Sequence, residues 1–191
     1  MGLMGRDAAM RFLAGFAFVC LGVLNSAAQS RVTELAQPDP IATAHGKPVV
    51  LIFVRSDCPI SRKYAPEIQQ LATKYKDRAT FWLVFPSRDD SVDIVDKHVR
   101  EFRYNIAALR DPSHELVRRA QVNITPEAAV FDAQGNLRYH GRIDDLYISF
   151  GRSRSAATEH DLDDALSSVV AGMKVDRPSA PAVGCYIADT K

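Results

Sequence analysis

The feature that most constrains the fold is an uninterrupted apolar run, Val49 to Val54, that leads directly into a helical pattern. A run of β-branched and aromatic residues is typical of a central strand covered on both faces. From Cys58 onward, apolar residues recur at helical spacing through Tyr75, which predicts an amphipathic helix with a kink at Pro66. We therefore expect a strand that feeds directly into a helix beginning at Cys58.

The same alternation of strands and helices continues along the chain. We predict strands at 79–85, 106–110, 127–131 and 137–142, helices at 92–104 and around 115–117, and a last helix from about 158 onward. Asp111 is the expected N-cap of the short helix, and Thr158 with Asp161 resembles a capping box. Elements in this order predict a mixed sheet with helices on both faces, whose site lies at the carboxyl ends of the strands. The loop before Cys58 lies at such an end.

The first 28 residues have the pattern of a signal peptide. Arg6 and Arg11 form a positive region, residues 12–24 are apolar, and Ser26-Ala27-Ala28 supplies small residues for cleavage after Ala28. We expect a periplasmic or secreted mature protein. The alternative is an uncleaved anchor, but the apolar run is shorter than the roughly 20 residues that span a bilayer. Once the signal is removed, we expect no stable membrane span.

The charge composition gives no indication of a nucleic-acid partner. The chain has 24 Lys and Arg against 23 Asp and Glu, and no long run of either sign. A nucleic-acid-binding protein carries a basic patch, and none is evident here. We expect a protein or small-molecule partner instead.

The length of 191 residues suits one domain with appendages. Residues 29–47 are polar with two prolines, which indicates an N-terminal linker, and residues 48–172 form the expected domain. Residues 173–191 form a Pro-rich C-terminal tail that carries Cys185.

Cysteine usage indicates redox chemistry. Cleavage after Ala28 removes Cys20 and leaves Cys58 and Cys185. Two cysteines are too few for a disulfide scaffold, but they suit a redox pair, or one reactive thiol and a bystander. A cysteine at a helix start faces unpaired N–H groups, which lowers its pKa. Arg55, Arg62 and Lys63 would add to this effect and Asp57 would oppose it, whereas an inert buried cysteine is the alternative.

Three features in order carry a family resemblance. They are Cys58-Pro59-Ile60-Ser61 after the first strand, Pro66 five residues later, and Thr125-Pro126 before the penultimate strand. Together they resemble the thioredoxin superfamily, specifically redoxin domains of the peroxiredoxin and thiol-disulfide exchange type, over about residues 40–172. The resemblance implies a three-layer α/β/α sandwich with a central mixed β-sheet.

The resemblance also implies roles for the residues that match. Cys58 is the expected nucleophile, and Pro126 is the expected cis-proline, whose preceding backbone at Thr125 lies against the active cysteine and pairs with an incoming peptide. Thr125 and Pro59 are the expected substrate contacts. A trans proline at a strand start is the alternative for Pro126.

The chain departs from the family pattern at informative positions. Ser61 stands where a second cysteine is usual; its hydroxyl can bond a Cys58 thiolate but cannot attack a mixed disulfide. The buried acid and the tryptophan that many thioredoxins carry are replaced by Ile52 and Asp57. A peroxidase signature would need Pro at Leu51 and Thr at Arg55, so peroxidase activity is only an alternative.

Cys185 is the candidate that could replace the missing second cysteine. It lies in a short apolar patch, residues 182–187, within the tail. From Gly172 the tail can extend about 3.3 Å per residue, roughly 40 Å in all, which is enough to cross a small domain. We expect it to reach Cys58 and to act as the resolving thiol. A free tail cysteine and a permanent disulfide that only fixes the tail remain alternatives.

Two further features receive a less specific interpretation. The acidic loop from Arg142 to Tyr147 is more often a solvated surface loop than a substrate clamp. The histidines show no close ligand spacing, so we assign no metal and no cofactor, although a site of Cys58, Cys185 and one histidine stays an alternative.

The sequence thus predicts an exported thiol-disulfide oxidoreductase. Its expected catalytic residues are Cys58, Cys185, Ser61 and Pro126. Its expected partner is an exported protein with a thiol or disulfide, or a small thiol. The alternatives are a peroxiredoxin-like peroxidase and a non-catalytic module that binds a metal or a protein.

Overall fold

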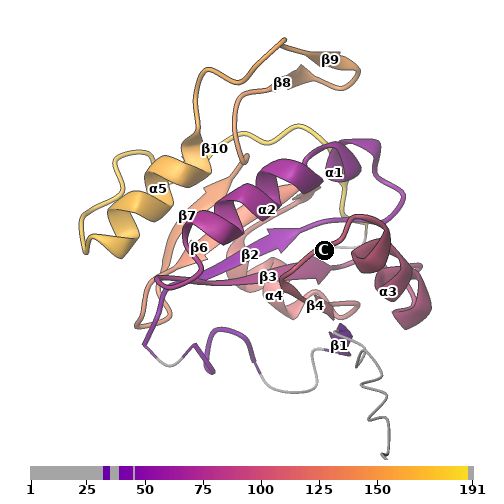
Figure 1. Ribbon diagram of the computed structural model, residues 1–191, viewed down its shortest axis with the longest axis horizontal. Helices are drawn as coiled ribbons and strands as arrows, with labels where there is room; N and C mark the ends of the chain where they lie inside the picture. The colour runs from indigo at the N-terminus through magenta and orange to yellow at the C-terminus, as the bar shows by residue number, and fades with distance from the viewer. Residues whose placement is uncertain (1–31, 35–38, 45, 189–191) are drawn as a thin grey trace, which may run out of the picture.

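A computed structural model describes residues 32–34, 39–44 and 46–188, so the expected signal peptide lies outside the described residues. A seven-stranded mixed sheet forms the centre of the molecule, with the strand order β1-β4-β3-β2-β6-β7-β10 (Figure 1). Its strands are β1 (Val32–Glu34), β2 (Val49–Phe53), β3 (Thr80–Phe85), β4 (Ala107–Arg110), β6 (Glu127–Phe131), β7 (Leu137–Gly141) and β10 (Ser179–Ala180).

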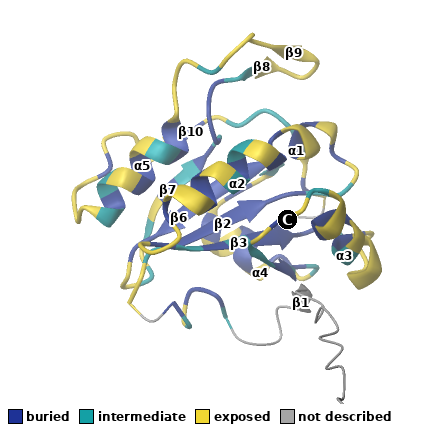
Figure 2. Ribbon diagram, in the orientation of Figure 1, coloured by how far each residue is buried: buried dark blue, intermediate teal, exposed yellow. Residues whose placement is uncertain are grey.

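Strand β2 lies in the middle of the sheet, between β3 and β6, and every one of its residues is buried, as the apolar run predicted. It runs parallel to β3 on one side and antiparallel to β6 on the other. The parallel half ends at β1 and the antiparallel half continues into β7. Figure 2 shows this middle of the sheet as the most buried part of the molecule.

Two apolar cores cover the two faces of the sheet. The larger core holds side chains of α1 (Pro59–Lys63), α2 (Ala65–Lys74), α3 (Val92–Glu101) and α5 (Asp161–Val170). The second core, on the other face, packs α4 (Glu115–Ala120) and the segment from Ile41 to Ala44 against the sheet. The expected thioredoxin-like α/β fold with a central mixed sheet is confirmed.

Short paired strands lie outside the main sheet. Strand β5 (Ile124–Thr125) pairs with β11 (Cys185–Tyr186), and β8 (Tyr147–Ser149) pairs with β9 (Arg152–Ser153) in a hairpin. In Figure 1 the β8–β9 hairpin projects beyond the layer of helices that contains α1 and α2. None of the helices among the described residues is long and apolar enough to cross a membrane.

The single kinked helix predicted from Cys58 to Tyr75 is wrong in detail. The structure has two helices, α1 and α2, that meet at Tyr64. Pro66 lies in the first turn of α2, where its missing N–H costs no hydrogen bond. The proline therefore sits at the start of a new helix and is not a kink inside one.

Two predicted helix starts also differ. The helix expected near Thr158 begins at Asp161, because the Thr158 hydroxyl donates to Asp145 Oδ2 at 2.7 Å instead of capping the helix. The short helix begins at Glu115, beyond Asp111, yet the Asp111 carboxylate still accepts the N–H groups of Glu115 and Val117 at 2.8 and 2.9 Å. Asp111 therefore binds the first-turn N–H groups as expected, from outside the helix.

Parts of the expected linker and tail form strands. Strand β1 lies within the expected linker and pairs with β4, and β10 lies within the expected tail and pairs with β7. A side chain at Gly141, which has a φ of +147°, would place its Cβ 2.2 Å from the Ala180 carbonyl oxygen. The absence of a side chain there allows the tail to add to the sheet edge.

The acidic loop is not the solvated loop that its composition suggested. Asp144 and Asp145 are buried, and each accepts hydrogen bonds inside the protein. Asp144 accepts the Tyr64 hydroxyl, and Asp145 accepts the N–H groups of Thr158 and Glu159. These carboxylates hold the base of the β8–β9 hairpin to the helix layer.

Candidate functional site

Cys58 lies where the central strand gives way to the first helix, at a carboxyl end of the sheet. It is the N-cap residue of α1, in extended backbone conformation, and only 1% of it is exposed. Its Sγ lies 3.2 Å from the Thr125 carbonyl oxygen and can donate to it as a thiol. The sulfur is therefore enclosed by its own helix on one side and by β5, which directly precedes Pro126, on the other.

Cys185, in the C-terminal tail, lies against the Cys58 sulfur. Its Sγ donates to Cys58 Sγ at 2.7 Å, and both cysteines are free thiols. A disulfide has a sulfur–sulfur distance of about 2.05 Å, so a small approach would allow the two to bond. The expected proximity of these two residues is found, although they are 127 positions apart in the sequence.

A backbone ladder holds the tail beside the site. Strand β11 runs antiparallel to β5, with Cys185 opposite Thr125 and Tyr186 opposite Ile124. The Thr125 hydroxyl donates to the Cys185 carbonyl oxygen at 3.2 Å, and the Ile187 N–H donates to the Asn123 carbonyl oxygen at 2.9 Å. The Thr125-Pro126 bond is cis, as the resemblance implied.

The surroundings of the Cys58 sulfur favour its thiolate form. Burial raises the pKa of Cys58, but hydrogen bonds from the Cys185 thiol, from the N–H and hydroxyl of Ser61, and from the N–H of Ile60 outweigh burial. Their sum leaves the pKa of Cys58 below its ordinary value of 9.0. These donors bond the charged sulfur more strongly than the neutral one, which is why they lower the pKa.

The second thiol has the opposite tendency. Burial, the hydrogen bond to Cys58 and the negative charge that develops on Cys58 raise the pKa of Cys185 to about 12. As the pH rises, Cys58 therefore loses its proton before Cys185 does. Of the two sulfurs, Cys58 is thus the more readily ionised, and Cys185 is the hydrogen-bond donor of the pair.

The nearby basic side chains contribute less than the sequence suggested. Arg55 forms an ion pair with Asp57 at 2.8 Å, and Arg62 forms one with Glu101 at 3.0 Å on the surface. The charges of Arg55 and Arg62 are thereby partly neutralised by their own partners. The thiolate is stabilised mainly by close hydrogen-bond donors.

The remaining predicted residues surround the same sulfur. Ser61 is fully buried, and its hydroxyl both bonds the Cys58 sulfur and accepts the Arg55 N–H at 3.4 Å. Pro59 is exposed at the first position of α1, next to Cys58. All six predicted residues thus lie in one cluster.

Sequence reasoning missed two residues that shape this cluster. A side chain at Gly184 would place its Cβ 2.1 Å from the Thr125 carbonyl oxygen, so only glycine fits the approach of the tail. Glu127 is buried, and its Oε2 accepts the N–H groups of Asn123 and Ile124 at 2.9 and 3.2 Å. The glycine immediately before Cys185 was the signal available in the sequence; nothing in the pattern distinguished Glu127.

Among the residues that the structure describes, no group of three or more His, Cys, Asp or Glu side chains is arranged to hold a metal ion.

The pKa difference between the two thiols leads to a prediction for the Cys185→Ala variant. Because the substitution removes a donor to the Cys58 sulfur, we expect the pKa of Cys58 to rise. In the reduced wild-type protein the thiolate should form at a pH below 9.0, and reactivity should increase with pH up to that pKa and then level off. A pH titration followed by the ultraviolet absorbance of the thiolate measures the midpoint for Cys58 in wild type and in Cys185→Ala.

Tyr186→Ala is the matched control for this titration, because Tyr186 is 76% exposed and pairs with β5 only through its backbone. It should leave the midpoint unchanged. Equal midpoints in wild type and Cys185→Ala would contradict the assigned role of the Cys185 thiol.

Comparison with known proteins agrees with this fold. Residues 46–137 match a family model described as thioredoxin-like. None of the curated proteins compared with the chain matches it.

Solved structures give the same result. A hypothetical protein of Sinorhizobium meliloti is similar, with a TM-score of 0.65 at 21% identity over 75% of this chain and 80% of that one. An uncharacterized conserved protein of Geobacillus kaustophilus has a TM-score of 0.66 at 23% identity over 74% and 77% of the two chains. The exposed lipoprotein thioredoxin of Streptococcus pneumoniae has a TM-score of 0.51 at 20% identity over 70% and 90%. At these identities the similarity establishes the thioredoxin-like fold.

Proposed function

We propose that this chain of thioredoxin-like fold is a thiol-disulfide oxidoreductase in which Cys58 is the nucleophile and Cys185 the resolving thiol. The observation that carries the proposal is the 2.7 Å contact between a sulfur with a lowered pKa and a sulfur with a raised one. Only a thiolate attacks a disulfide, so the lowered pKa of Cys58 makes it the nucleophile.

The reaction has two exchange steps. The Cys58 thiolate attacks one sulfur of a partner disulfide, the partner's S–S bond breaks, and its other sulfur leaves as a thiolate. Cys185 then gives its proton to the departing thiolate and attacks Cys58 Sγ, so that a Cys58–Cys185 disulfide forms and the partner's second sulfur leaves. The partner gains two electrons and the chain loses two. An external dithiol reductant would restore the thiols, and a dithiol partner would run the same steps in reverse.

The surrounding residues assist these steps. The Ser61 hydroxyl and the N–H groups at the start of α1 stabilise the Cys58 thiolate, both before attack and when it leaves. The Thr125 backbone in β5 is the edge that an extended polypeptide would pair with in place of the tail, and exposed Pro59 forms part of the surface around the cysteine. Ser61 cannot resolve the mixed disulfide, which leaves that role to Cys185.

The pattern of residues 1–28 supports export of this activity. We infer that the mature chain acts in the periplasm or outside the cell on exported proteins or small thiols, where disulfides persist.

Trapping tests the proposed roles. Cys185→Ala should accumulate mixed disulfides through Cys58 when it is incubated with a disulfide-bonded substrate, because the resolving thiol is missing. Non-reducing electrophoresis and mass spectrometry would detect the adduct, and wild type should yield a Cys58–Cys185 linked peptide instead. The Cys58→Ser, Cys185→Ala double variant is the control and should form no adduct. Absence of an adduct on Cys185→Ala would contradict the proposal.

A further inference from the structure

The C-terminal tail occupies the edge of β5 that borders the Cys58 sulfur. Gly184, Cys185, Tyr186 and Ile187 form an extended segment on this edge, which we call the tail strand. It is held by the β11 ladder and by the Ile187 N–H bond to Asn123. In addition, Arg55 donates to the Tyr186 carbonyl oxygen at 3.4 Å. The tail strand therefore lies on the backbone that a partner peptide would need.

Access to Cys58 depends on this edge. The side chain is 1% exposed, and its sulfur contacts Thr125 on one side and Cys185 on the other. A partner cysteine that bonds to Cys58 must bring its own sulfur to the position that Cys185 Sγ now holds. An extended partner segment can do so by pairing with β5 in the register of the tail strand, with its cysteine opposite Thr125.

On the basis of the proposed function, we propose that the tail strand binds to β5 in the place that an extended segment of the partner takes during exchange. The partner is then an extended segment in which a glycine precedes the reacting cysteine and an aliphatic residue lies two positions after it. The tail and the partner bind to β5 in turn, because the edge of β5 that borders the Cys58 sulfur cannot pair with both at once.

The three positions of this pattern come from the tail strand itself. At the Gly184 position any Cβ would lie 2.1 Å from the Thr125 carbonyl oxygen and 2.9 Å from the Ile124 side chain. Tyr186 is 76% exposed, so the position after the cysteine accepts any residue. Ile187 is 6% exposed and packs in the second core, so an aliphatic residue fits two positions after the cysteine.

The order of exchange follows from this shared edge. The tail strand leaves β5 and the partner segment pairs there. The Cys58 thiolate attacks the sulfur of the partner's disulfide-bonded cysteine, the partner's S–S bond breaks, and its other sulfur leaves as a thiolate, so that the mixed disulfide forms. The partner segment then unpairs, and the returning Cys185 attacks Cys58 Sγ and releases the partner as a thiol. The electron count is that of the two exchange steps above.

Peptide exchange on the full chain tests the proposal. The probes are two symmetric peptide disulfides, one with the tail sequence Ala-Val-Gly-Cys-Tyr-Ile-Ala and one with Ala in place of that Gly. On Cys185→Ala, mass spectrometry measures the rate at which each peptide bonds to Cys58. We expect the Gly peptide to react about tenfold faster, because the Cβ of the Ala peptide costs it one or two backbone hydrogen bonds to β5.

A second variant tests the competition between tail and partner. Adding Gly184→Ala to Cys185→Ala should weaken the pairing of the tail strand and speed the reaction of the Gly peptide several-fold. Adding Tyr186→Ala instead is the matched control and should leave the rate unchanged, because that side chain is exposed.

The outcomes separate this inference from the proposed function. Equal rates for the two peptides, or reaction of Cys58 with a small aromatic disulfide but with neither peptide, would overturn the inference and leave the oxidoreductase intact. Failure of Cys58 to react with any of the three disulfides would overturn the proposed function itself. An unchanged rate after Gly184→Ala would show that the tail strand does not compete.

Discussion

Cys58→Ser should reduce the disulfide-exchange rate by at least about a thousandfold, to the level of the uncatalysed reaction. A serine hydroxyl is not ionised at neutral pH and does not attack disulfides, whereas the Cys58 sulfur is held in a site that lowers its pKa. The tail should stay docked, because its pairing with β5 is made by the backbone. The rate at which each protein reduces a peptide disulfide, monitored through the free thiol released, measures the fall in the exchange rate.

The same substitution should change the remaining thiol. The hydrogen bond and the charge of Cys58 are two of the causes that raise the pKa of Cys185 to about 12, so that pKa should fall in the variant. Cys185→Ser is the control, because it should retain the first exchange step while losing the second. Exchange that survives in Cys58→Ser would mean that Cys185 is the primary nucleophile, contrary to the division of roles given above.

Phe53→Ala should lower the free energy of unfolding by about 3 to 5 kcal/mol, the usual cost of removing a buried phenylalanine side chain. Phe53 is fully buried at the end of β2, in the core that also holds α4, and it pairs with Val84 on one side and Glu127 on the other. Removal of its ring leaves a cavity in that core. Chemical denaturation of the reduced protein gives the difference.

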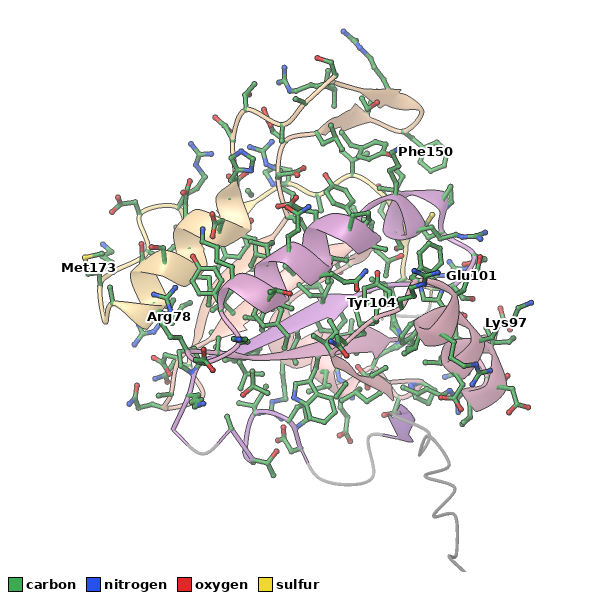
Figure 3. All side chains as sticks on the ribbon, viewed as in Figure 1. Arg78, Lys97, Glu101, Tyr104, Phe150 and Met173 are labelled. Carbon is green, nitrogen blue, oxygen red and sulfur yellow. The ribbon has the colours of Figure 1, made fainter. Side chains whose placement is uncertain are left out.

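Phe150→Ala is the matched control for this substitution. Phe150 is 68% exposed, and Figure 3 shows it at the β8–β9 hairpin, away from the sheet. Its loss should change the free energy of unfolding by no more than about 0.5 kcal/mol. Similar values for the two variants would contradict the buried position of Phe53 in the second core.

The pattern of the sequence predicted the elements that depend on local chemistry. The bounds of β6 were correct, and those of β2, β3, β4 and β7 were correct to within one residue at each end. Continuous apolar runs specify buried strands regardless of what packs on them, which is why these elements could be predicted. The cis Thr125-Pro126 bond followed from the family resemblance.

The polar contacts could not be predicted in the same way. Thr158 and Asp161 have the spacing of a capping box, but Thr158 bonds Asp145, which lies 13 positions away. The side chains of Asp144 and Asp145 are buried because the chain folds back over them, and composition alone indicated a solvated loop. A hydrogen bond depends on which groups meet in space, and local spacing reports only those within one or two helical turns.

The sequence by itself determined that this chain forms an α/β fold with a cysteine at the start of a helix, and that a serine, Ser61, stands where a second cysteine is usual in the motif. It also provided a distant cysteine on a tail long enough to reach the first. Only the tertiary structure decided that Cys185 lies opposite Thr125 with its sulfur 2.7 Å from that of Cys58. Strand and helix patterns arise from neighbours along the chain, whereas the register of the tail depends on a carbonyl oxygen nearly 60 residues away that leaves room only for glycine at position 184.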